Sequence, residues 1–392
     1  IQYIAQFLPD SEKVREDLLK FAKAHDRRNY QLVRFIISPE YDFGTVHKAI
    51  KELTKRLQGP NIGVLDTLVP LLYRSGCFVF NRSHLSTIMD YSRTDKDGMG
   101  STAHELLNEI SQRNADLFKT HIGELCKDLI DKAPDEKTAN DPAMVETLKA
   151  CASFAESNPG EVPGNREFTS TLLNYALYGQ PPTAAKYAVS ILMAKRDDRS
   201  ALSAADLLQR SLSKWDYGNK NFLNRLAAIG QLELLAPKVT QDADDEILDM
   251  AVQKILLSVR TDAKDSDPEW VEDAELDDEC RAKCLCLKIL VNRLRGDDAQ
   301  EPNERSRATF KLLKSLVRKD GEICKVKDTP KYHRNRLRLL AAQSLLKLCK
   351  TKHLDEMLGP ADFNNLAWVV QSSCPQVRRL FLERLQKYLM RG

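Results

Sequence analysis

Residues 375–385 are Pro-Gln-Val-Arg-Arg-Leu-Phe-Leu-Glu-Arg-Leu, and this stretch decides the fold. Apolar side chains recur here three or four residues apart, at Val377, Leu380, Phe381 and Leu385, and Tyr388 continues the series. Because an α-helix has 3.6 residues per turn, this spacing gathers the apolar side chains on one face. The stretch therefore predicts an amphipathic helix over residues 375–390.

The same spacing recurs along most of the chain, whereas the alternation of period two that marks a β-strand is hard to find. Glycine and proline number only 16 each in 392 residues, which favours helices joined by short loops over sheets with many turns. The predicted helices cover residues 44–57, 64–75, 82–92, 99–113, 115–131, 142–156, 166–178, 182–195, 201–214, 220–235, 244–258, 278–294, 303–318, 333–349, 361–371 and 375–390.

The apolar helices keep a rough period. They begin near residues 102, 142, 182 and 221, and Leu337 is followed by Val377 at a similar interval. A period of about 40 residues is typical of two-helix HEAT or armadillo repeats, and residues 375–385 resemble the second helix of a HEAT repeat. We therefore predict an all-α fold, a HEAT/armadillo-type α-α superhelical solenoid, in which residues 1–392 form one continuous segment.

An acidic loop insertion at about 261–279 interrupts this period. It contains ten acidic residues and a single base, Lys264, with Trp270 and Val271 in the middle. The insertion is either a solvated loop or an acidic loop that docks a partner. A calcium loop is not expected, because Trp270 stands at the sixth position, where such a loop needs glycine.

The composition argues against several classes of function. The formal net charge is +3, from 59 basic and 56 acidic residues, whereas a dedicated duplex-DNA binder usually has a strong basic excess. No stretch approaches 18 apolar residues, so we expect no membrane span. The chain starts at Ile1 rather than at methionine, and we interpret it as an internal fragment of a longer protein.

Nine cysteines lie mostly in apolar helical stretches, and we expect reduced core residues of a cytosolic or nuclear protein. Cys284 and Cys286 point to different faces of one predicted helix, and no histidine lies near them or Cys280, so zinc is not expected. Catalytic spacings such as His-Glu-x-x-His and Gly-x-Ser-x-Gly do not occur in the sequence. We predict no enzyme activity, no cofactor and no metal.

One basic cluster lies on an exposed predicted helix, and a second precedes an apolar helix. The first comprises Lys48, Lys51, Lys55 and Arg56, and the second comprises Lys331, His333, Arg334, Arg336 and Arg338. Each cluster is either a solvated polar face or a docking site for phosphate, an acidic peptide or a nucleic-acid backbone. Aromatic residues do not interleave with them, so a stacking platform for single strands is not supported.

Residues 71–81, Leu-Leu-Tyr-Arg-Ser-Gly-Cys-Phe-Val-Phe-Asn, combine aromatic side chains with an arginine. These side-chain types anchor protein interfaces. They equally fill cores between helices, and both interpretations stay open.

Several blocks, taken in order, resemble the cohesin-associated HEAT-repeat proteins called Pds five. The blocks are Phe-Asn-Arg-Ser-His at 80–84, Ala-Lys-Tyr-Ala at 185–188, Leu-Ala-Ala-Ile-Gly at 226–230, Leu-Leu-Ala-Pro at 234–237, Trp-Val at 270–271, Arg-Leu-Arg-Leu-Leu-Ala-Ala at 336–342 and Gln-Val-Arg-Arg-Leu-Phe at 376–381. Their order, and the acidic loop that bears Trp270 and Val271, carry the resemblance. It covers nearly the whole chain, and the divergence of the repeats suggests a fungal member.

The resemblance implies a non-enzymatic cohesin regulator, located in the nucleus and associated with chromosomes. It implies binding to the kleisin subunit of cohesin, control of sister-chromatid cohesion and of cohesin release, and work with Wapl through other parts of a longer protein. We assign no site for the inositol polyphosphate with which family members are associated. An extended kleisin segment would lie along the solenoid, with apolar anchors between helices and charges at the rim. The predicted partner-binding residues are Tyr73, Arg74, Phe80 and Asn81, with Lys186 and Tyr187 as a second group.

Two other functions stay open. One is another HEAT-repeat scaffold, of the transport or phosphatase-scaffold type, although the irregular helix lengths and the 261–279 insertion count against it. The other is a HEAT protein that contacts DNA directly, which a steep loss of affinity with salt would reveal.

Overall fold

The computed structural model describes residues 26–57, 68–73, 76, 82–113, 115–324 and 328–389, and these residues contain helices and no strand. The predicted all-α fold is confirmed. The chain divides into two compact units, and the prediction of one continuous segment stays a prediction. The first unit holds the residues up to Lys132 together with Asp141–Gly164, and the second holds Ala133–Asn140 together with the residues from Asn165 onward.

The first unit consists of short helices that pack in neighbouring pairs. Its elements are α2 (Arg27–Ile37), α3 (Phe43–Leu57), a helix at 68–73, α5 (Arg82–Thr94), η1 (Lys96–Gly98), α6 (Gly100–Arg113), η2 (Ala115–Thr120), α7 (Ile122–Asp131) and α8 (Met144–Ser157). α2 packs on α3, α5 on α6, and α6 on α8. Leu32, Ile36, Ile50 and Leu53 are buried together between α2 and α3, which form a small core of their own.

The second unit is longer. Its elements are α9 (Arg166–Tyr178), α10 (Thr183–Leu192), α11 (Asp198–Leu212), α12 (Phe222–Leu235), α13 (Pro237–Thr240), η3 (Gln241–Ala243), α14 (Asp244–Leu248), η4 (Asp249–Leu256), α15 (Asp278–Gly296), α16 (Glu304–Arg318), α17 (Lys331–Leu348), α18 (Lys352–Asp355), α19 (Pro360–Ala367), η5 (Trp368–Gln371) and α20 (Pro375–Leu389).

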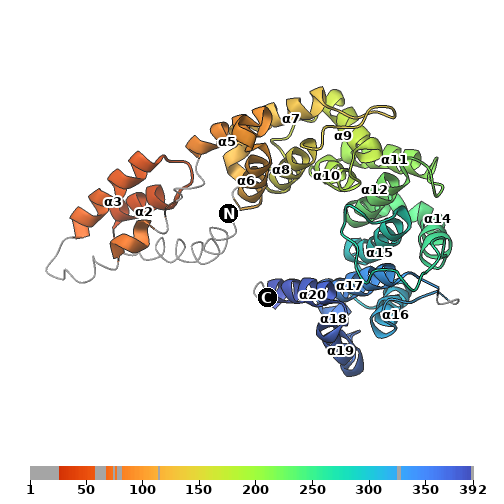
Figure 1. Ribbon diagram of the computed structural model, residues 1–392. Helices are drawn as coiled ribbons and strands as arrows, with labels where there is room; N and C mark the ends of the chain where they lie inside the picture. The colour runs from red at the N-terminus through yellow and green to blue at the C-terminus, as the bar shows by residue number, and fades with distance from the viewer. Residues whose placement is uncertain are drawn as a thin grey trace. The chain divides into compact units, whose positions relative to one another are not determined.

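Successive helix pairs build the second unit in two layers. α9 packs on α10, α11 on α12, η4 on α15, α16 on α17, and η5 on α20. The second members of these pairs, α10, α12, α15, α17 and α20, also contact one another in chain order, and we call them the B layer. They lie on the inner side of the arc that this unit forms in Figure 1, and the first members form the A layer outside them. This stacking of helix pairs is the architecture of a HEAT-type solenoid.

Capping side chains set where several of these helices begin. The side chain of Asn165 accepts a hydrogen bond from the Phe168 amide at 3.0 Å, and that of Asp197 accepts one from the Ser200 amide at 2.8 Å. Asn303 accepts one from the amide of Ser306 at 2.9 Å. Each oxygen satisfies an amide of the first turn that has no partner within the helix, so the sequence itself marks the helix start.

The stretch 375–385 behaves as its spacing predicts. Val377 and Phe381 are buried in a core that extends from α15 to α20, and Leu380 and Leu385 pack at its edge. The amphipathic helix expected over residues 375–390 is confirmed as α20.

Three predicted helices are interrupted. Residues 361–371 form α19 followed by the 3₁₀-helix η5. Residues 115–131 form the 3₁₀-helix η2 followed by α7, and residues 244–258 form α14 followed by the π-helical η4, where the Leu257 amide donates to the Val252 carbonyl. The buried residues of η4 are Met250, Ala251, Ile255 and Leu256. Their spacing of five suits the wider π turn, which keeps both pairs on the core side.

The cysteines are mostly core residues, as expected. All eight described cysteines are free thiols, and six of them, including Cys280 and Cys286, are buried. Burial raises the pKa of Cys286, which keeps its thiol protonated.

Among the described residues, no helix combines the length and the apolar content needed to cross a membrane.

Candidate functional site

Tyr73 is the one residue of the first predicted group that the structure describes, because Arg74, Phe80 and Asn81 lie outside the described residues. Tyr73 packs beside the small core of α2 and α3. Its hydroxyl lies 2.7 Å from Nδ1 of His47 on α3, and the His47 ring stacks on Phe43 with 5.6 Å between the ring centroids. These contacts fix one edge of the Tyr73 ring and leave the side chain half-buried.

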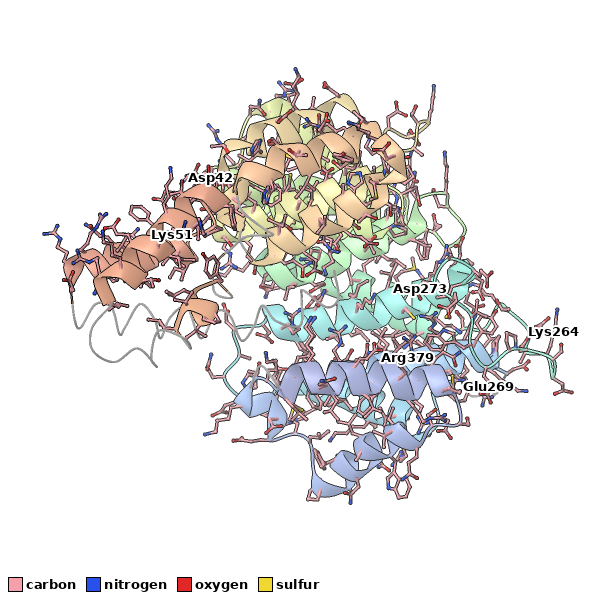
Figure 2. All side chains as sticks on the ribbon, turned by 60° about the vertical axis from the view of Figure 1, so that its left-hand side comes forward. Asp42, Lys51, Lys264, Glu269, Asp273 and Arg379 are labelled. Carbon is pink, nitrogen blue, oxygen red and sulfur yellow. The ribbon has the colours of Figure 1, made fainter. Side chains whose placement is uncertain are left out.

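A hollow of about 410 Å³ lies next to Tyr73. α3 supplies one wall with Ile50, Lys51, Thr54 and Lys55, and the helix at 68–73 supplies Val69 and Tyr73. Lys51 and Lys55 are exposed (Lys51 is labelled in Figure 2) and form no ion pair within the described part of the chain. An apolar floor with a cationic rim suits an acidic segment that carries an apolar anchor.

Lys186 and Tyr187, the second predicted group, lie on α10 in the other unit. The Lys186 side chain is exposed, and its ammonium lies 5.5 Å from the centroid of the Tyr187 ring. Tyr187 is half-buried between the buried residues Ala184 and Ala188, so it lies at the edge of the core rather than inside it. Since Tyr73 and Lys186 belong to different units, they form two separate candidate sites.

Lys186 has cationic neighbours on three further helices of the B layer. The ammonium of Lys347 on α17 is half-buried, and burial together with the charges of Arg295, Lys186, Arg384 and Lys288 lowers its pKa to about 8. Arg295 and Lys288 come from α15, and Arg384 comes from α20. We call these five residues the B-layer cationic cluster.

Within the described part of the chain, carboxylates do not neutralise four of the five members of this cluster. Lys288, Arg295, Lys347 and Arg384 form no ion pair with an acid among the residues described, and Arg295 donates a hydrogen bond only to the side chain of Asn292, at 3.2 Å. Like charges that are held close together disfavour one another's ionised form. A bound anion would relieve this repulsion, so the cluster favours an anionic ligand.

Of the five residues in this cluster, only Lys186 is among the residues predicted from the sequence to bind a partner. The other four members are spread over three helices, with Lys288 and Arg295 on α15, Lys347 on α17 and Arg384 on α20, so no single basic run contains them. The repeat period of about 40 residues could have shown which residues occupy equivalent positions on successive B-layer helices. The insertion before α15 interrupts this period, so the equivalent positions are not evident from the sequence.

The acidic insertion and the second basic cluster, which the sequence leaves far apart, bind each other. The Arg336 guanidinium lies over the Trp270 ring, 3.7 Å from its centroid. The same side chain donates to the carbonyl of Val271 and pairs with Asp273. The loop therefore folds back onto the start of α17, and Trp270 packs against the core.

Backbone carbonyls of the insertion hold it in the same place. Asn335 Nδ2 donates to the Glu269 carbonyl at 2.7 Å, and Lys331 Nζ donates to the Asp265 carbonyl at 3.1 Å. Figure 2 labels Glu269 and Asp273 on this loop, with Lys264 at its outer edge. Most acidic side chains of the insertion, such as Glu269, are exposed, whereas Asp273 and Asp277 bind side chains of α17.

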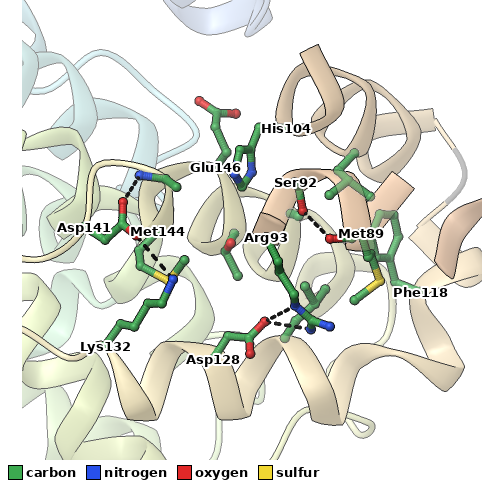
Figure 3. Close-up of a pocket in the computed structure, with 15 residues that line it drawn as sticks. Met89, Ser92, Arg93, His104, Phe118, Asp128, Lys132, Asp141, Met144 and Glu146 are labelled. Carbon is green, nitrogen blue, oxygen red and sulfur yellow. Dashed lines mark hydrogen bonds and ion pairs between the residues drawn. The ribbon is translucent and has the colours of Figure 1, made fainter. Parts of the chain in front are cut away.

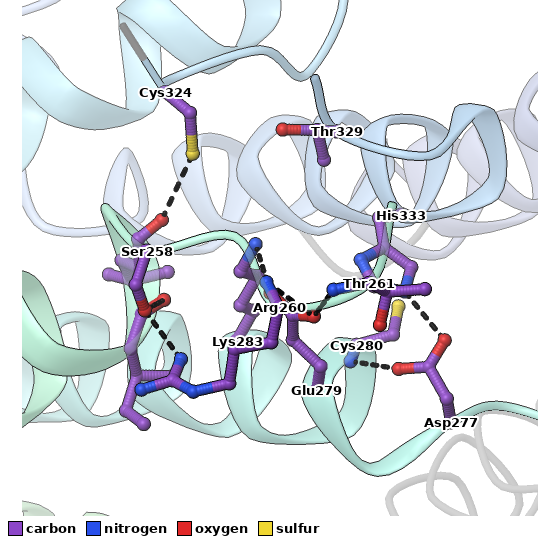
Figure 4. Close-up of polar contacts among 12 residues, drawn as sticks. Ser258, Arg260, Thr261, Asp277, Glu279, Cys280, Lys283, Cys324, Thr329 and His333 are labelled. Atoms are coloured by element: carbon purple, nitrogen blue, oxygen red, sulfur yellow. Dashed lines mark hydrogen bonds and ion pairs between the residues drawn. The ribbon is translucent and has the colours of Figure 1, made fainter. Parts of the chain in front are cut away.

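Asp277 closes the loop at the first residue before α15. Its carboxylate accepts hydrogen bonds from the Cys280 amide at 2.7 Å and from the Tyr332 hydroxyl, and it lies 2.7 Å from Nε2 of the buried His333 (Figure 4). Burial raises the pKa of Asp277, but the hydrogen bonds from His333 and Tyr332 outweigh it and hold the pKa well below its usual range.

Glu279 and Lys283 form a fully buried ion pair at 2.9 Å, one turn further along α15 (Figure 4). Glu279 also accepts hydrogen bonds from the amides of Thr261 at 2.7 Å and Arg260 at 3.1 Å, at the other end of the loop. Burial raises the pKa of Glu279, but the contacts with Lys283 and Thr261 outweigh it, so the pKa lies below its ordinary value.

These contacts decide between the interpretations of both segments. A purely solvated loop is wrong, because Trp270 and the loop backbone pack on the protein. A solvated face is wrong for Arg336 and Arg338 as well, since Arg338 pairs with Asp320 at 2.9 Å and is only 13% exposed. The acidic segment that binds Arg336 is the chain's own insertion, whereas Arg338 binds Asp320 outside that insertion.

A cavity of about 300 Å³ lies in the first unit, between α5, α6, α7 and α8 (Figure 3). Four of its charged side chains pair with one another: Arg93 donates to Asp128 at 2.7 Å, and Lys132 pairs with Asp141 at 3.2 Å. Burial lowers the pKa of His104 in the lining. The hydroxyl of Ser92 in the same lining donates a hydrogen bond to the Met89 carbonyl at 2.8 Å.

The fold places the chain among helical-repeat proteins of the HEAT type. Over residues 1–392 the chain matches the family described as Sister chromatid cohesion protein PDS5 protein, and it belongs to this family.

Relatives with this description occur in yeasts and vertebrates. Sister chromatid cohesion protein PDS5 of Saccharomyces cerevisiae is 26% identical over 425 residues, covering 99% of this chain and 33% of that protein. The protein of Schizosaccharomyces pombe is 26% identical, covering 94% of this chain and 30% of its own length. PDS5 homolog B of Homo sapiens is 23% identical, and the match covers 100% of this chain and 28% of that protein. The chain thus spans about a third of the length of these relatives.

Among solved structures, that of Kap121p bound to Pho4p matches with a TM-score of 0.40 at 16% identity. The match covers 95% of this chain and 37% of the Kap121p chain. At that score we draw nothing from the likeness.

Proposed function

We propose that this chain is a non-enzymatic scaffold segment that acts in sister-chromatid cohesion, in the nucleus on chromosomes, by binding an acidic segment of the kleisin subunit of cohesin. Family membership supports the process, and the B-layer cationic cluster supports the mode of binding. An extended acidic segment would cross α10, α15, α17 and α20, where its carboxylates would relieve the repulsion among the five cations. Control of cohesin release, and work with Wapl, stay predictions for the longer protein.

Tyr187 supplies an apolar element beside this cluster. Its ring is half-buried next to Lys186, so a ligand side chain can pack on the ring while a neighbouring carboxylate reaches the ammonium. A polar rim around an aromatic anchor is the usual anatomy of a specific interface. The hollow at Tyr73, with Lys51 and Lys55, is proposed as a second contact for the same partner.

The test is a fluorescence-polarisation titration of the chain with overlapping peptides that tile the kleisin. We expect saturable binding to one acidic segment. The double substitution Lys288→Glu with Lys347→Glu should weaken that binding roughly 30-fold, because it removes two cations and adds two repulsive charges. Tyr73→Ala, tested separately, reports on the second contact.

The matched control is Arg199→Glu with Lys238→Glu. Both residues are exposed, lie on α11 and α13 outside the cluster and form no ion pair within the described residues, so the net charge changes equally. The proposal fails if no kleisin peptide binds, or if the control weakens binding as much as the cluster variant. Equal weakening would show attraction to overall charge rather than a site.

A further inference from the structure

A second cationic hollow lies on the A layer, away from the B-layer cluster. It has a volume of about 460 Å³ and is lined by α16 and the segment from Met357 to Asp362. The cations at its rim are Arg307, Lys311 and Arg318. All three are exposed and form no ion pair or hydrogen bond within the described residues.

The floor of this hollow is built differently from its rim. The Phe310 ring is buried beneath it, and the half-buried Met357 forms part of the wall. Lys314 is already neutralised, since its ammonium lies 2.7 Å from Asp362 and donates to the Met357 carbonyl at 2.6 Å. The ion pair fixes the wall of the hollow to α16 and leaves the three rim cations without a counter-charge.

From this arrangement we propose that the α16 hollow is a docking site for an acidic, extended segment of a partner protein that carries one apolar anchor. The rim cations extend over roughly 16 Å of helix, at 1.5 Å per residue, which matches several residues of an extended peptide. The anchor would sit over Phe310 and Met357, and acidic residues on both sides of it would pair with Arg307, Lys311 and Arg318.

A nucleic-acid backbone fits this hollow less well. Phosphates would gain nothing from the apolar floor of Phe310 and Met357. Surfaces that hold a nucleic-acid backbone depend on salt-sensitive cationic contacts alone, whereas an anchored peptide also buries apolar area. The site lies on the A layer, so it is independent of the proposed kleisin contact.

The experiment selects a phage-displayed library of random 16-residue peptides on the 392-residue chain. Enriched peptides should be net acidic and share one aromatic or large aliphatic residue. Lys311→Glu with Arg318→Glu should lower the affinity of the best peptide roughly 30-fold, and Arg199→Glu with Lys238→Glu should leave it unchanged. Replacing the anchor of the peptide by alanine should weaken binding about tenfold.

Each contrary outcome overturns the proposal. Failure to enrich acidic peptides, or enrichment that survives the Lys311 and Arg318 reversal, removes the site. Equal binding of the alanine peptide shows simple charge attraction. Tighter binding of a 16-nucleotide thymidine strand, lost in the same double variant, assigns the surface to nucleic acid. Lys288→Glu with Lys347→Glu should leave the selected peptide bound, which separates this site from the kleisin contact.

Discussion

At the scale of single residues, Glu233 on α12 carries a buried carboxylate that its surroundings compensate poorly. It is 1% exposed, and its Oε1 has no hydrogen-bond partner. Burial raises the pKa of Glu233 to about 7, because it outweighs the opposing attraction of the Arg293 charge. A carboxyl group whose pKa rises on folding contributes its full stabilisation when the pH lies below the pKa of the unfolded state. This stabilisation is lost as the pH rises through the pKa of the folded state.

We expect Glu233→Gln to stabilise the protein by about 2 kcal/mol at pH 8 and to have little effect at pH 4.5. The glutamine keeps the shape of the side chain but has no charge to bury. Urea unfolding at the two pH values measures the difference. An equal effect at both pH values would contradict the assignment of a raised pKa.

Lys347 provides a second pH dependence, in binding rather than in folding. Its pKa is lowered to about 8, so the free protein loses this charge as pH rises through 8, before an unperturbed lysine would. An acidic ligand favours the protonated form, and binding above pH 8 must therefore take up a proton.

The affinity for the kleisin peptide should fall about fivefold between pH 7 and pH 9.5. Lys347→Arg keeps its charge over this range and should remove most of that fall. Polarisation titrations across the range, in one buffer series at constant ionic strength, give the comparison. An unchanged pH profile in the arginine variant would separate Lys347 from the ligand.

At the scale of elements, the 258–277 loop behaves as part of the core of the second unit. Its two ends are tied to α15 through Glu279 and Asp277, and its middle is held on α17 by Arg336. Long loops inside compact domains usually serve a function or pack on the protein. Here Trp270 packs against the core shared by α15 and α17 and joins the loop to it.

Trp270→Ala should destabilise this arrangement by about 2 kcal/mol, because Arg336 loses its aromatic partner and the core loses apolar contact. Hydrogen exchange followed by mass spectrometry should show faster exchange in residues 258–277 and in the first turns of α17. Lys264→Ala, at the exposed edge of the loop, is the control and should change neither. Unaltered hydrogen exchange in Trp270→Ala would mean that the backbone contacts alone hold the loop on α17.

At the scale of the whole molecule, each helix pair contacts mainly its neighbours along the chain, so stability is a sum over adjacent pairs. The core of α2 and α3 and the core of α15 to α20 are separate buried clusters. A defect in one cluster therefore lowers local stability without reaching the other.

Leu345→Ala, at a side chain that is 1% exposed, should cost about 3 kcal/mol in the cluster of α15 to α20. Hydrogen exchange should accelerate there and stay unchanged in α2 and α3. Leu53→Ala, which is 3% exposed in the other cluster, is the reciprocal control. Acceleration throughout the chain in either variant would show that the molecule unfolds as one cooperative unit.

The sequence by itself determined the helices and their pairing. α9 lies at the predicted residues 166–178, and α20 follows the spacing of Val377 and Phe381, because helix period and N-terminal caps act within a few residues of the chain. Only the tertiary structure decided which charges meet. Lys186 and Arg384 lie near Lys347, and Arg336 contacts Trp270, although many residues separate them along the chain. Packing of successive helix pairs creates such neighbours, and no local pattern encodes a contact that depends on how pairs stack around an insertion.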